Sequence, residues 1–291
     1  MADKPSVGVF GLGIIGAQVA GHLREAGYRV AVWNRTPRAE EGFRASPAEV
    51  AAECSVLQLF VADAEAVFST LEACGDVLGP QHVVVCSATI GHEATMKAAA
   101  MAQARGARFL DAPFTGSRGA AQRRQLVYYV AGEQEAFALA RPVLEASSRA
   151  VVHLDRVGDA AVVKVATNLI AAVSVQALAE AFALCQKAGV DVAQFTAALA
   201  ENACRSGTMD LKLPKMVQGD YEPHFSLKHM SKDVQLALSL ARQLGVDAPA
   251  TECTGELMLR GLSHGWGDLD FAALFQTYGE PAPGGDDSRK A

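Results

Sequence analysis

Six residues near the N-terminus have the glycine spacing of a loop that can hold a pyrophosphate: Gly11-Leu12-Gly13-Ile14-Ile15-Gly16. An apolar run precedes them at 6–10 and an amphipathic run follows at 17–26, which is the order strand, tight turn, helix. The first glycine permits the turn, the second lets backbone approach the phosphates, and the third lets the helix pack closely on the strand. The sequence therefore predicts a dinucleotide site in which these six residues meet the phosphates at the helix N-terminus.

A lysine and an asparagine are spaced one helical turn apart in the second half of the chain. Lys164 stands between Val162-Val163 and Val165-Ala166, and Asn168 follows on the same helix face. A lysine among apolar residues costs desolvation unless it has a partner or a task. Its ammonium group can donate a proton, and a nearby amide can hold the lysine or a substrate oxygen. The alternative is a structural lysine whose stem packs on the core while its ammonium group stays in water.

The end of the second apolar strand indicates which dinucleotide binds. Proteins that select NAD usually carry Asp or Glu there, which accepts a hydrogen bond from the ribose 2′-hydroxyl. This chain has Asn34-Arg35-Thr36 instead. A guanidinium binds a 2′-phosphate through paired, charge-assisted hydrogen bonds, whereas a carboxylate would repel it. We therefore predict NADP rather than NAD, with Arg35 as an ordinary solvated loop residue as the alternative.

The elements that position these residues alternate through the first half of the chain. Short β-rich runs occur at 7–10, 28–33, 56–61, 83–87, 108–111, 127–131 and 151–154. Helical patterns lie between most of them, at 48–53, 64–73 and 92–104. Such alternation predicts an α/β fold of the Rossmann type, in which helices cover both faces of a doubly wound, mainly parallel sheet.

The strands stop after Leu154, and helical periodicity fills the rest of the chain. One long helix is predicted from Asp159 to Ala188, and shorter ones at 193–201, 232–244 and 251–262. We expect three parts: a dinucleotide-binding domain at 1–160, an all-α substrate and oligomerisation domain at 161–280, and a disordered tail at 281–291. The substrate is expected in the cleft between the two domains.

The composition excludes several kinds of partner. A chain of 291 residues suits two domains, and a net charge of −6 argues against nucleic acid. The apolar stretch Val165–Cys185 contains Asn168, Gln176 and Glu180, so we expect a buried helix rather than a membrane span. No signal peptide is recognised before the first strand, and we expect a cytoplasmic protein. The six cysteines lack metal-ligand spacing, so neither a metal nor disulfides are predicted: Cys54, Cys74, Cys86, Cys185, Cys204 and Cys253.

Four motifs follow one another along the chain. They are the glycine loop, Asp111-Ala112-Pro113-Phe114-Thr115-Gly116-Ser117, Lys164-x-x-x-Asn168 and Lys232-Asp233. In this order they resemble the β-hydroxyacid dehydrogenase family, over nearly the whole chain except the tail. Three further stretches are most similar to the glyoxylate and succinic semialdehyde reductases of that family: Trp33 to Thr36, Phe225 to His229 and Gly267 to Phe271.

The resemblance implies a role for each motif. Lys164 would be the catalytic acid/base, and Asn168 would help to orient the substrate. The loop Thr115-Gly116-Ser117 would receive the substrate carboxylate through its backbone N–H groups and hydroxyls. Further cofactor contacts are implied at Val61, Ala62, Thr89 and Lys232. The implied activity is NADPH-dependent reduction of a small aldehyde acid to a hydroxy acid by hydride transfer.

Some residues near these motifs depart from the family pattern. Ala160 stands where a glycine is usual, Phe114 where a smaller aliphatic residue is usual, and Arg124 where a small residue is usual. Arg123 and Arg124 indicate either a larger or more anionic substrate, or simply two side chains in solvent. These positions leave the exact substrate open.

Three other functions compete with reduction of an aldehyde acid. Imine reductases share the fold but typically lack the catalytic lysine, which is present here. A 3-hydroxyisobutyrate-type dehydrogenase would use the same motifs. A non-catalytic scaffold would be marked by loss of that lysine.

The long helix also predicts an oligomer. It has more apolar surface than one domain is expected to bury, which predicts a homodimer or homotetramer built through the helical domains.

Overall fold

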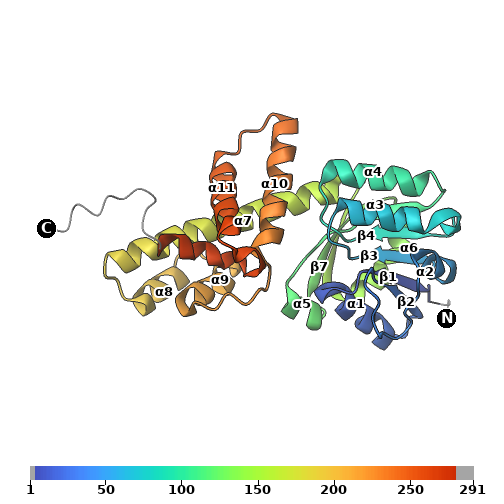
Figure 1. Cartoon of the computed structure of the whole chain (residues 1–291), viewed down its shortest axis with the longest axis horizontal. Coiled ribbons are helices and arrows are strands. Elements are labelled where there is room, and N and C mark those ends of the chain that lie inside the picture. The colour runs from blue at the N-terminus through green and yellow to red at the C-terminus, as the bar shows by residue number, and fades with distance from the viewer. Residues whose placement is uncertain (1–3, 280–291) are drawn as a thin grey trace. The chain divides into compact units, whose positions relative to one another are not determined.

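The chain folds into two compact units that share one helix. The structure is a computed structural model and describes residues 4–279 (Figure 1). The first unit ends at Ala166 and the second begins at Thr167. The boundary expected from the sequence stands at 160, and helix α7 (Asp159–Lys187) runs through both positions. The tail expected at 281–291 lies outside the described residues.

A single sheet forms the centre of the first unit. Its strand order is β2-β1-β3-β4-β5-β7-β6, and β8 pairs with β7. The strands are β1 (Val7–Phe10), β2 (Val30–Trp33), β3 (Val56–Leu59), β4 (Val83–Cys86), β5 (Arg108–Asp111), β6 (Phe114–Thr115), β7 (Leu126–Gly132) and β8 (Ser148–Leu154). Neighbouring strands among β1 to β5 are parallel, but β7 is antiparallel to both β5 and β6. The predicted α/β fold with a mainly parallel sheet is confirmed, and the antiparallel pairing of β7 is the part that the alternation did not indicate.

Six α-helices connect these strands. They are α1 (Ile14–Glu25), α2 (Pro47–Glu53), α3 (Ala64–Ala73), α4 (His92–Gln103), α5 (Arg118–Gln122) and α6 (Gln134–Glu145), with a short 3-10 turn at Gly75–Val77. Helix α2 begins after a capping serine, because the Ser46 hydroxyl accepts a hydrogen bond from the Glu49 amide. Neither β6 nor α5 was predicted, because an element of two or five residues is too short to show a hydrophobic period.

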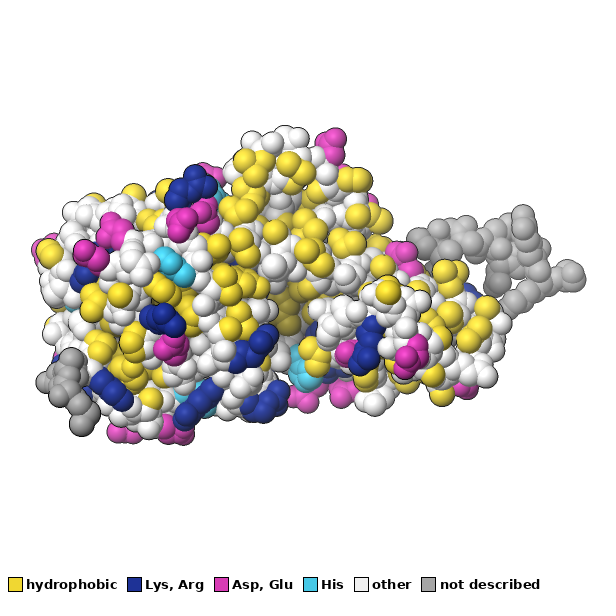
Figure 2. All heavy atoms as spheres, turned by 180° about the vertical axis from the view of Figure 1, so that it is seen from behind, with side chains coloured by type: hydrophobic (Ala, Val, Ile, Leu, Met, Phe, Trp, Pro, Cys, Tyr) yellow, Lys and Arg dark blue, Asp and Glu magenta, His cyan; other side chains and the backbone are white. Residues whose placement is uncertain are grey.

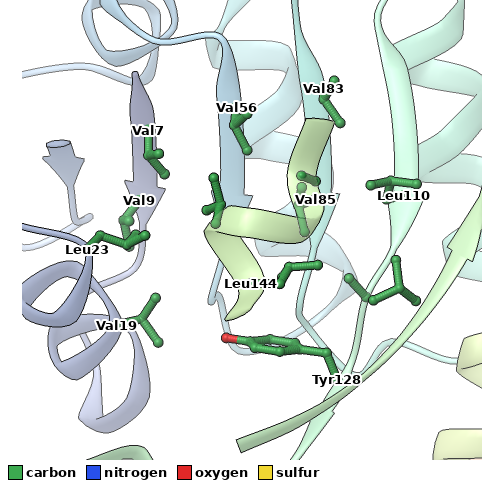
Figure 3. Close-up of a cluster of buried hydrophobic side chains, with 14 of the residues drawn as sticks. Val7, Val9, Val19, Leu23, Val56, Val83, Val85, Leu110, Tyr128 and Leu144 are labelled. Atoms are coloured by element: carbon green, nitrogen blue, oxygen red, sulfur yellow. The ribbon is translucent and has the colours of Figure 1, made fainter. Parts of the chain in front are cut away.

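Buried side chains cover both faces of the sheet, which is why its strands read as continuous apolar runs. Along β4, Val83 and Val85 enter the core cluster on one face, whereas Val84 and Cys86 enter the cluster on the other. Tyr128 belongs to the first of these clusters and is completely buried among its aliphatic side chains (Figure 3). Such two-sided burial fixes the strand register, because a slip of one residue would exchange the two faces.

The register brings the carboxyl ends of the strands to one edge of the sheet. Phe10, the last residue of β1, pairs with the last residues of β2 and β3, Trp33 and Leu59. Leu59 pairs with the end of β4, which in turn pairs with the end of β5 at Asp111. The loops that follow these strands therefore lie side by side, as in other doubly wound sheets whose ligands bind at this edge.

The second unit consists of helices. After α7 come α8 (Val192–Ala200), α9 (Gly207–Gln218), α10 (Leu227–Leu244) and α11 (Pro249–Ser263), followed by 3-10 turns at Trp266–Asp268 and Phe271–Tyr278. Helix α9 was not predicted, because Gly207 and Pro214 lower its apparent helix propensity. It begins where the Ser206 hydroxyl accepts a hydrogen bond from the Met209 amide. Helix α10 starts five residues earlier than the predicted Lys232.

Helix α7 is long and apolar enough to cross a membrane by length and composition. Its most apolar 18-residue stretch is 44% buried within the structure, so only one side of the helix packs against the core. Ile170 and Leu184 are 63% and 71% exposed on the other side. The expected buried helix thus has an uncovered apolar face in the described chain.

Of the two arginines at the end of α5, Arg123 and Arg124, the second contacts another helix of the first unit. Arg124 has φ 56°, a left-handed conformation in which glycine is preferred. Its guanidinium pairs with the Glu25 carboxylate, and its Nε donates to Nδ1 of His22 at 3.2 Å. The Nε2 atom of His22 lies 2.8 Å from the Ala121 carbonyl oxygen. Arg124 thus fastens the end of α5 to α1, which favours the structural interpretation of this residue over a role in binding an anionic substrate.

Candidate active site

The glycine loop has the geometry that a pyrophosphate requires. Gly11 has φ +94°, and a Cβ atom there would lie 2.5 Å from the carbonyl oxygen of Phe60. A Cβ atom at Gly16 would lie 2.0 Å from the carbonyl oxygen of Gly11, so the start of α1 packs directly on the loop. A Cβ atom at Gly13 would meet no atom of the described chain within 4 Å. The backbone at Gly13 is therefore open to approach where the first amide groups of α1 lack intrahelical partners, and these residues fit a dinucleotide.

Asn34 supports the glycine loop from the end of β2. Its Oδ1 accepts a hydrogen bond from the Leu12 amide at 2.9 Å, and its Nδ2 donates to the Thr36 carbonyl at 2.8 Å. The side chain predicted to contact the cofactor thus holds two segments of its site in place. Arg35 and Thr36 are exposed beside it, and no hydrogen bond or ion pair ties the Arg35 guanidinium to residues 4–279. A guanidinium so placed is available to an external phosphate.

The other predicted residues of the first unit follow neighbouring strands. Val61 and Ala62 come after β3, and Thr89 comes after β4. The loop Thr115-Gly116-Ser117 begins in β6 and leads into α5. Gly116 has φ +131°, and a Cβ atom there would lie 2.9 Å from Leu126, so this turn requires glycine. Because the carboxyl ends of β1 to β5 are in register, the predicted cofactor residues gather at that edge of the sheet.

Asp111 joins this edge to the start of α7. Its carboxyl group is 1% exposed, and its Oδ2 accepts a hydrogen bond from the Ala161 amide at 2.7 Å, with a second from the Gly158 amide. Burial raises the pKa of Asp111 to about 7, against the two amide hydrogen bonds, which lower it. Lys164 is buried one turn further along α7. Asp111 opens the motif at 111–117 without a predicted role, and its position at the end of a buried strand was the available signal.

Asn168 and Lys232 meet at a second buried carboxylate. Nδ2 of Asn168 donates to Oδ2 of Asp233 at 2.6 Å, and the Lys232 ammonium lies 3.1 Å from Oδ1 of the same residue. Asp233 is 2% exposed. Lys232, which the resemblance assigns to the cofactor, therefore has an ion-pair partner of its own in the second unit. Asp233 belongs to the Lys232-Asp233 motif without a predicted role, and in the structure it fixes the amide of Asn168.

The fold and these residues together define an NAD(P)-dependent oxidoreductase. Residues 6–156 match the NAD binding domain of 6-phosphogluconate dehydrogenase, and residues 158–278 match the NAD-binding domain of NADP-dependent 3-hydroxyisobutyrate dehydrogenase. The chain belongs to the β-hydroxyacid dehydrogenase family.

Two similar proteins and a solved structure agree with this assignment. Glyoxylate/succinic semialdehyde reductase 2 (chloroplastic) of Arabidopsis thaliana is 32% identical, over 94% of this chain and 79% of the relative. Reductase 1 of the same plant is 30% identical, over 93% of this chain and 97% of the relative. Among solved structures, 3-hydroxyisobutyrate dehydrogenase of Mycobacterium tuberculosis superposes with a TM-score of 0.88 at 26% identity, covering 94% of this chain and 99% of that one.

The open backbone at Gly13 gives a test of the dinucleotide site. Gly13→Ala adds a methyl group that meets no protein atom, so the free energy of unfolding should change by no more than about 1 kcal/mol. The same methyl group occupies space that a pyrophosphate needs, so Kd for NADPH should rise by about tenfold or more, measured by fluorescence titration. Gly16→Ala is the control, since its methyl group collides with backbone and should lower stability. Unchanged NADPH binding by Gly13→Ala would contradict the site.

The buried carboxyl of Asp111 gives a pH dependence of stability. Because its pKa is raised in the folded state, its contribution to stability is fully present below the unfolded value near 4 and is lost as the pH rises towards about 7. Asp111→Asn cannot ionise, so stability of the wild type should fall relative to this variant by at least about 1 kcal/mol between pH 4 and pH 7. Urea unfolding at several pH values measures this difference. A constant difference would show that Asp111 is ionised throughout this range.

Proposed function

We propose that this protein is an NADPH-dependent reductase that converts a small aldehyde acid, of the glyoxylate or succinic semialdehyde type, to the corresponding hydroxy acid. One observation carries the proposal. The first unit contains the open glycine loop, the Thr115-Gly116-Ser117 loop and a buried Lys164, and the Asp111 carboxyl joins the strand before that loop to the helix that carries the lysine. These are the parts that hydride transfer to a carbonyl carbon requires.

The residues have distinct tasks in this proposal. A bound NADPH supplies the hydride. The backbone N–H groups and hydroxyls of Thr115, Gly116 and Ser117 bind the carboxylate of a short substrate such as glyoxylate, in which it is attached to the reacting carbonyl carbon. Lys164 stabilises the negative charge that develops on the carbonyl oxygen and donates the proton that completes the alcohol. Asn168, whose amide nitrogen is fixed on Asp233, orients the substrate.

Two alternatives within the family are weaker. Reduction of an imine requires no lysine at the position of Lys164, so a buried lysine there favours an oxygen rather than a nitrogen substrate. Oxidation of a 3-hydroxyisobutyrate-type alcohol would use the same residues in reverse, with neutral Lys164 accepting the proton. The greater similarity of Asn34-Arg35-Thr36 to the reductases favours reduction.

Removal of the Lys164 amine tests the proposed chemistry. Lys164→Ala should lower kcat for reduction of glyoxylate and succinic semialdehyde by about a hundredfold or more, because the proton donor is lost. NADPH binding should remain, because the glycine loop is untouched. The decrease in NADPH absorbance measures turnover, and a cyclic imine serves as the comparison substrate. Near-normal turnover by the variant would exclude the role of Lys164.

Arg35 tests the preference for NADP. The 2′-phosphate is the group that distinguishes the two cofactors, and a charge-assisted pair with it contributes about 1.5–3 kcal/mol. Arg35→Ala should therefore raise KM for NADPH by about tenfold or more and leave KM for NADH nearly unchanged. Steady-state kinetics with both cofactors measure this. Equal changes for the two cofactors would remove the basis for NADP.

The uncovered face of α7 supports an assembly of two or four copies. Ile170, Val173, Ala177 and Leu184 follow one another at spacings that place them on one side of the helix. Figure 2 also shows apolar side chains (yellow) over the helices of the second unit. Leu244 in α10 and Leu259 in α11 are exposed. An apolar stripe of this length favours contact with a second copy.

Light scattering should give a mass above the 30.5 kDa of one chain. Ile170→Glu should lower that mass, because it places a charge on the apolar face. A monomeric wild type at micromolar concentration would contradict the proposal.

A further inference from the structure

The first turn of α10 holds a histidine in a defined orientation. Nδ1 of His229 lies 2.7 Å from the Ser226 hydroxyl oxygen. The His229 ring also stacks on Phe225, with the ring centres 6.1 Å apart and the planes inclined by 24°. The hydrogen bond at one edge of the ring and the stacking on one of its faces fix its orientation, while the residue remains exposed. Its second nitrogen, Nε2, makes no hydrogen bond with residues 4–279.

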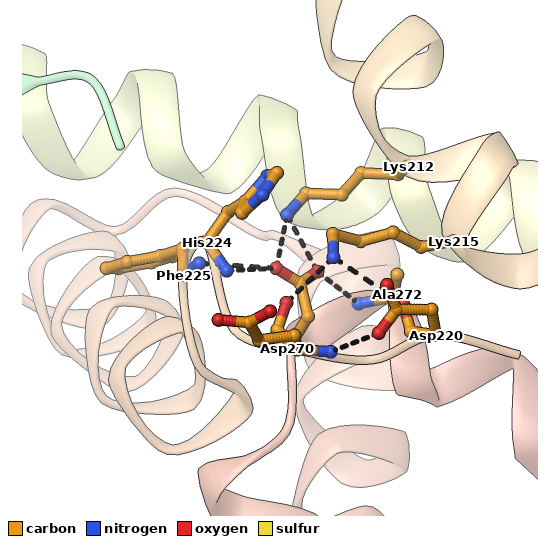
Figure 4. Close-up of polar contacts among 8 residues, drawn as sticks. Lys212, Lys215, Asp220, His224, Phe225, Asp270 and Ala272 are labelled. Carbon is orange, nitrogen blue, oxygen red and sulfur yellow. Dashed lines mark hydrogen bonds and ion pairs between the residues drawn. The ribbon is translucent and has the colours of Figure 1, made fainter. Parts of the chain in front are cut away.

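A buried ion pair anchors the segment that carries these contacts. The Asp270 carboxylate is fully buried and accepts hydrogen bonds from the Lys212 ammonium at 2.7 and 2.8 Å (Figure 4). It also accepts from the backbone amides of His224 and Phe225 at 2.9 and 3.2 Å. The chain immediately before α10 is therefore held by a carboxylate that cannot be released without leaving buried charges unpaired. Such an anchor gives the Phe225 ring, and the histidine stacked on it, a fixed position.

His229 shares a helix face with the cluster of Asn168, Lys232 and Asp233. Residues three and four apart lie on the same side of a helix, so His229 precedes Lys232 and Asp233 by one turn of α10. Four residues advance a helix by about 6 Å. Asp233 is buried and holds the amide of Asn168, whereas His229 is exposed at the start of the same face. The face thus offers a second polar group about one turn from the amide that orients the substrate.

We propose that His229 determines specificity by donating a hydrogen bond from Nε2 to a substrate carboxylate that lies two carbons away from the reacting aldehyde group. The substrate class is then the semialdehyde of a dicarboxylic acid, such as succinic semialdehyde, whose single carboxylate lies on His229. Glyoxylate, whose carboxylate is bonded to the aldehyde carbon, is too short to reach this group. The inference rests on the proposed function, in which Asn168 orients the reacting carbonyl group.

The surroundings of His229 suit such a donor. Burial lowers the pKa of His229, and the nearby ammonium groups of Lys232 and Lys228 lower it further, while Asp233 and Asp268 oppose this. The ring is therefore neutral at pH 7. In the neutral ring the Ser226 hydroxyl donates to Nδ1, which leaves the proton on Nε2. The carboxylate of Asp268 is paired with Lys228 at 2.5 Å, so its charge is already balanced.

His229→Leu tests the proposal, because leucine keeps the packing against Phe225 but has no donor. We expect kcat/KM for succinic semialdehyde to fall by about tenfold or more, the effect of losing a hydrogen bond to a charged group, and kcat/KM for glyoxylate to change less than about twofold. His229→Gln should recover part of the loss, because its amide can donate. His264→Leu is the control, because it removes an exposed histidine of the same unit that stacks on Trp266. It should change kcat/KM for neither substrate.

Each outcome decides the proposal. Equal loss for both substrates, or no loss for either, would overturn it while leaving the reductase function in place. A wild-type protein that reduces neither substrate would overturn the proposed function itself, and the inference with it. Should His229→Leu fail to fold, Ser226→Ala removes only the hydroxyl that orients the ring. It should give a smaller loss that is still confined to succinic semialdehyde, and the absence of that selectivity would likewise overturn the proposal.

Discussion

The hydrogen bond from the Ala161 amide to the Asp111 carboxyl is the interaction on which the proposed chemistry depends. Asp111 is the last residue of β5, and the chain that follows it becomes the Thr115-Gly116-Ser117 loop. Ala161 lies in the first turn of the helix that carries Lys164. A single buried side chain therefore sets the position of the proposed proton donor relative to the loop proposed to bind the substrate. Burial is what makes it effective, because a rival hydrogen bond to water is excluded.

Buried carboxyl groups also fix other groups by hydrogen bonds in the second unit. Asp233 fixes the amide of Asn168, and Asp270 fixes the backbone before α10. In each case a carboxylate with little or no exposure accepts hydrogen bonds from groups far away in the sequence. Directional bonds of this kind orient side chains more precisely than apolar packing alone, which is the requirement of a site that must hold a carbonyl group and its proton donor in register.

The sequence allowed the fold to be predicted well and the site only in part. The ends of β1 and β5 were predicted as they occur, because a fully buried parallel strand is a short apolar run between turns. Strand β6 (Phe114–Thr115) and helix α5 were not predicted, because segments this short show no hydrophobic periodicity. The prediction that Asn34 binds the cofactor did not include its side-chain hydrogen bonds to Leu12 and Thr36. A contact between Leu12 and Asn34, 22 residues apart, leaves no trace in local pattern. Asp111 and Asp233 act through partners of that kind.

The central claim is that hydride passes to the aldehyde carbon of an aldehyde acid. Reduction of glyoxylate or succinic semialdehyde with NADPH deuterated at C4 of the nicotinamide ring tests it most directly, with the product examined by NMR or mass spectrometry. We expect one deuterium on the carbon that bears the new hydroxyl group, from one of the two C4 positions only. Product without deuterium at that carbon, or no hydroxy acid from either substrate, would contradict it.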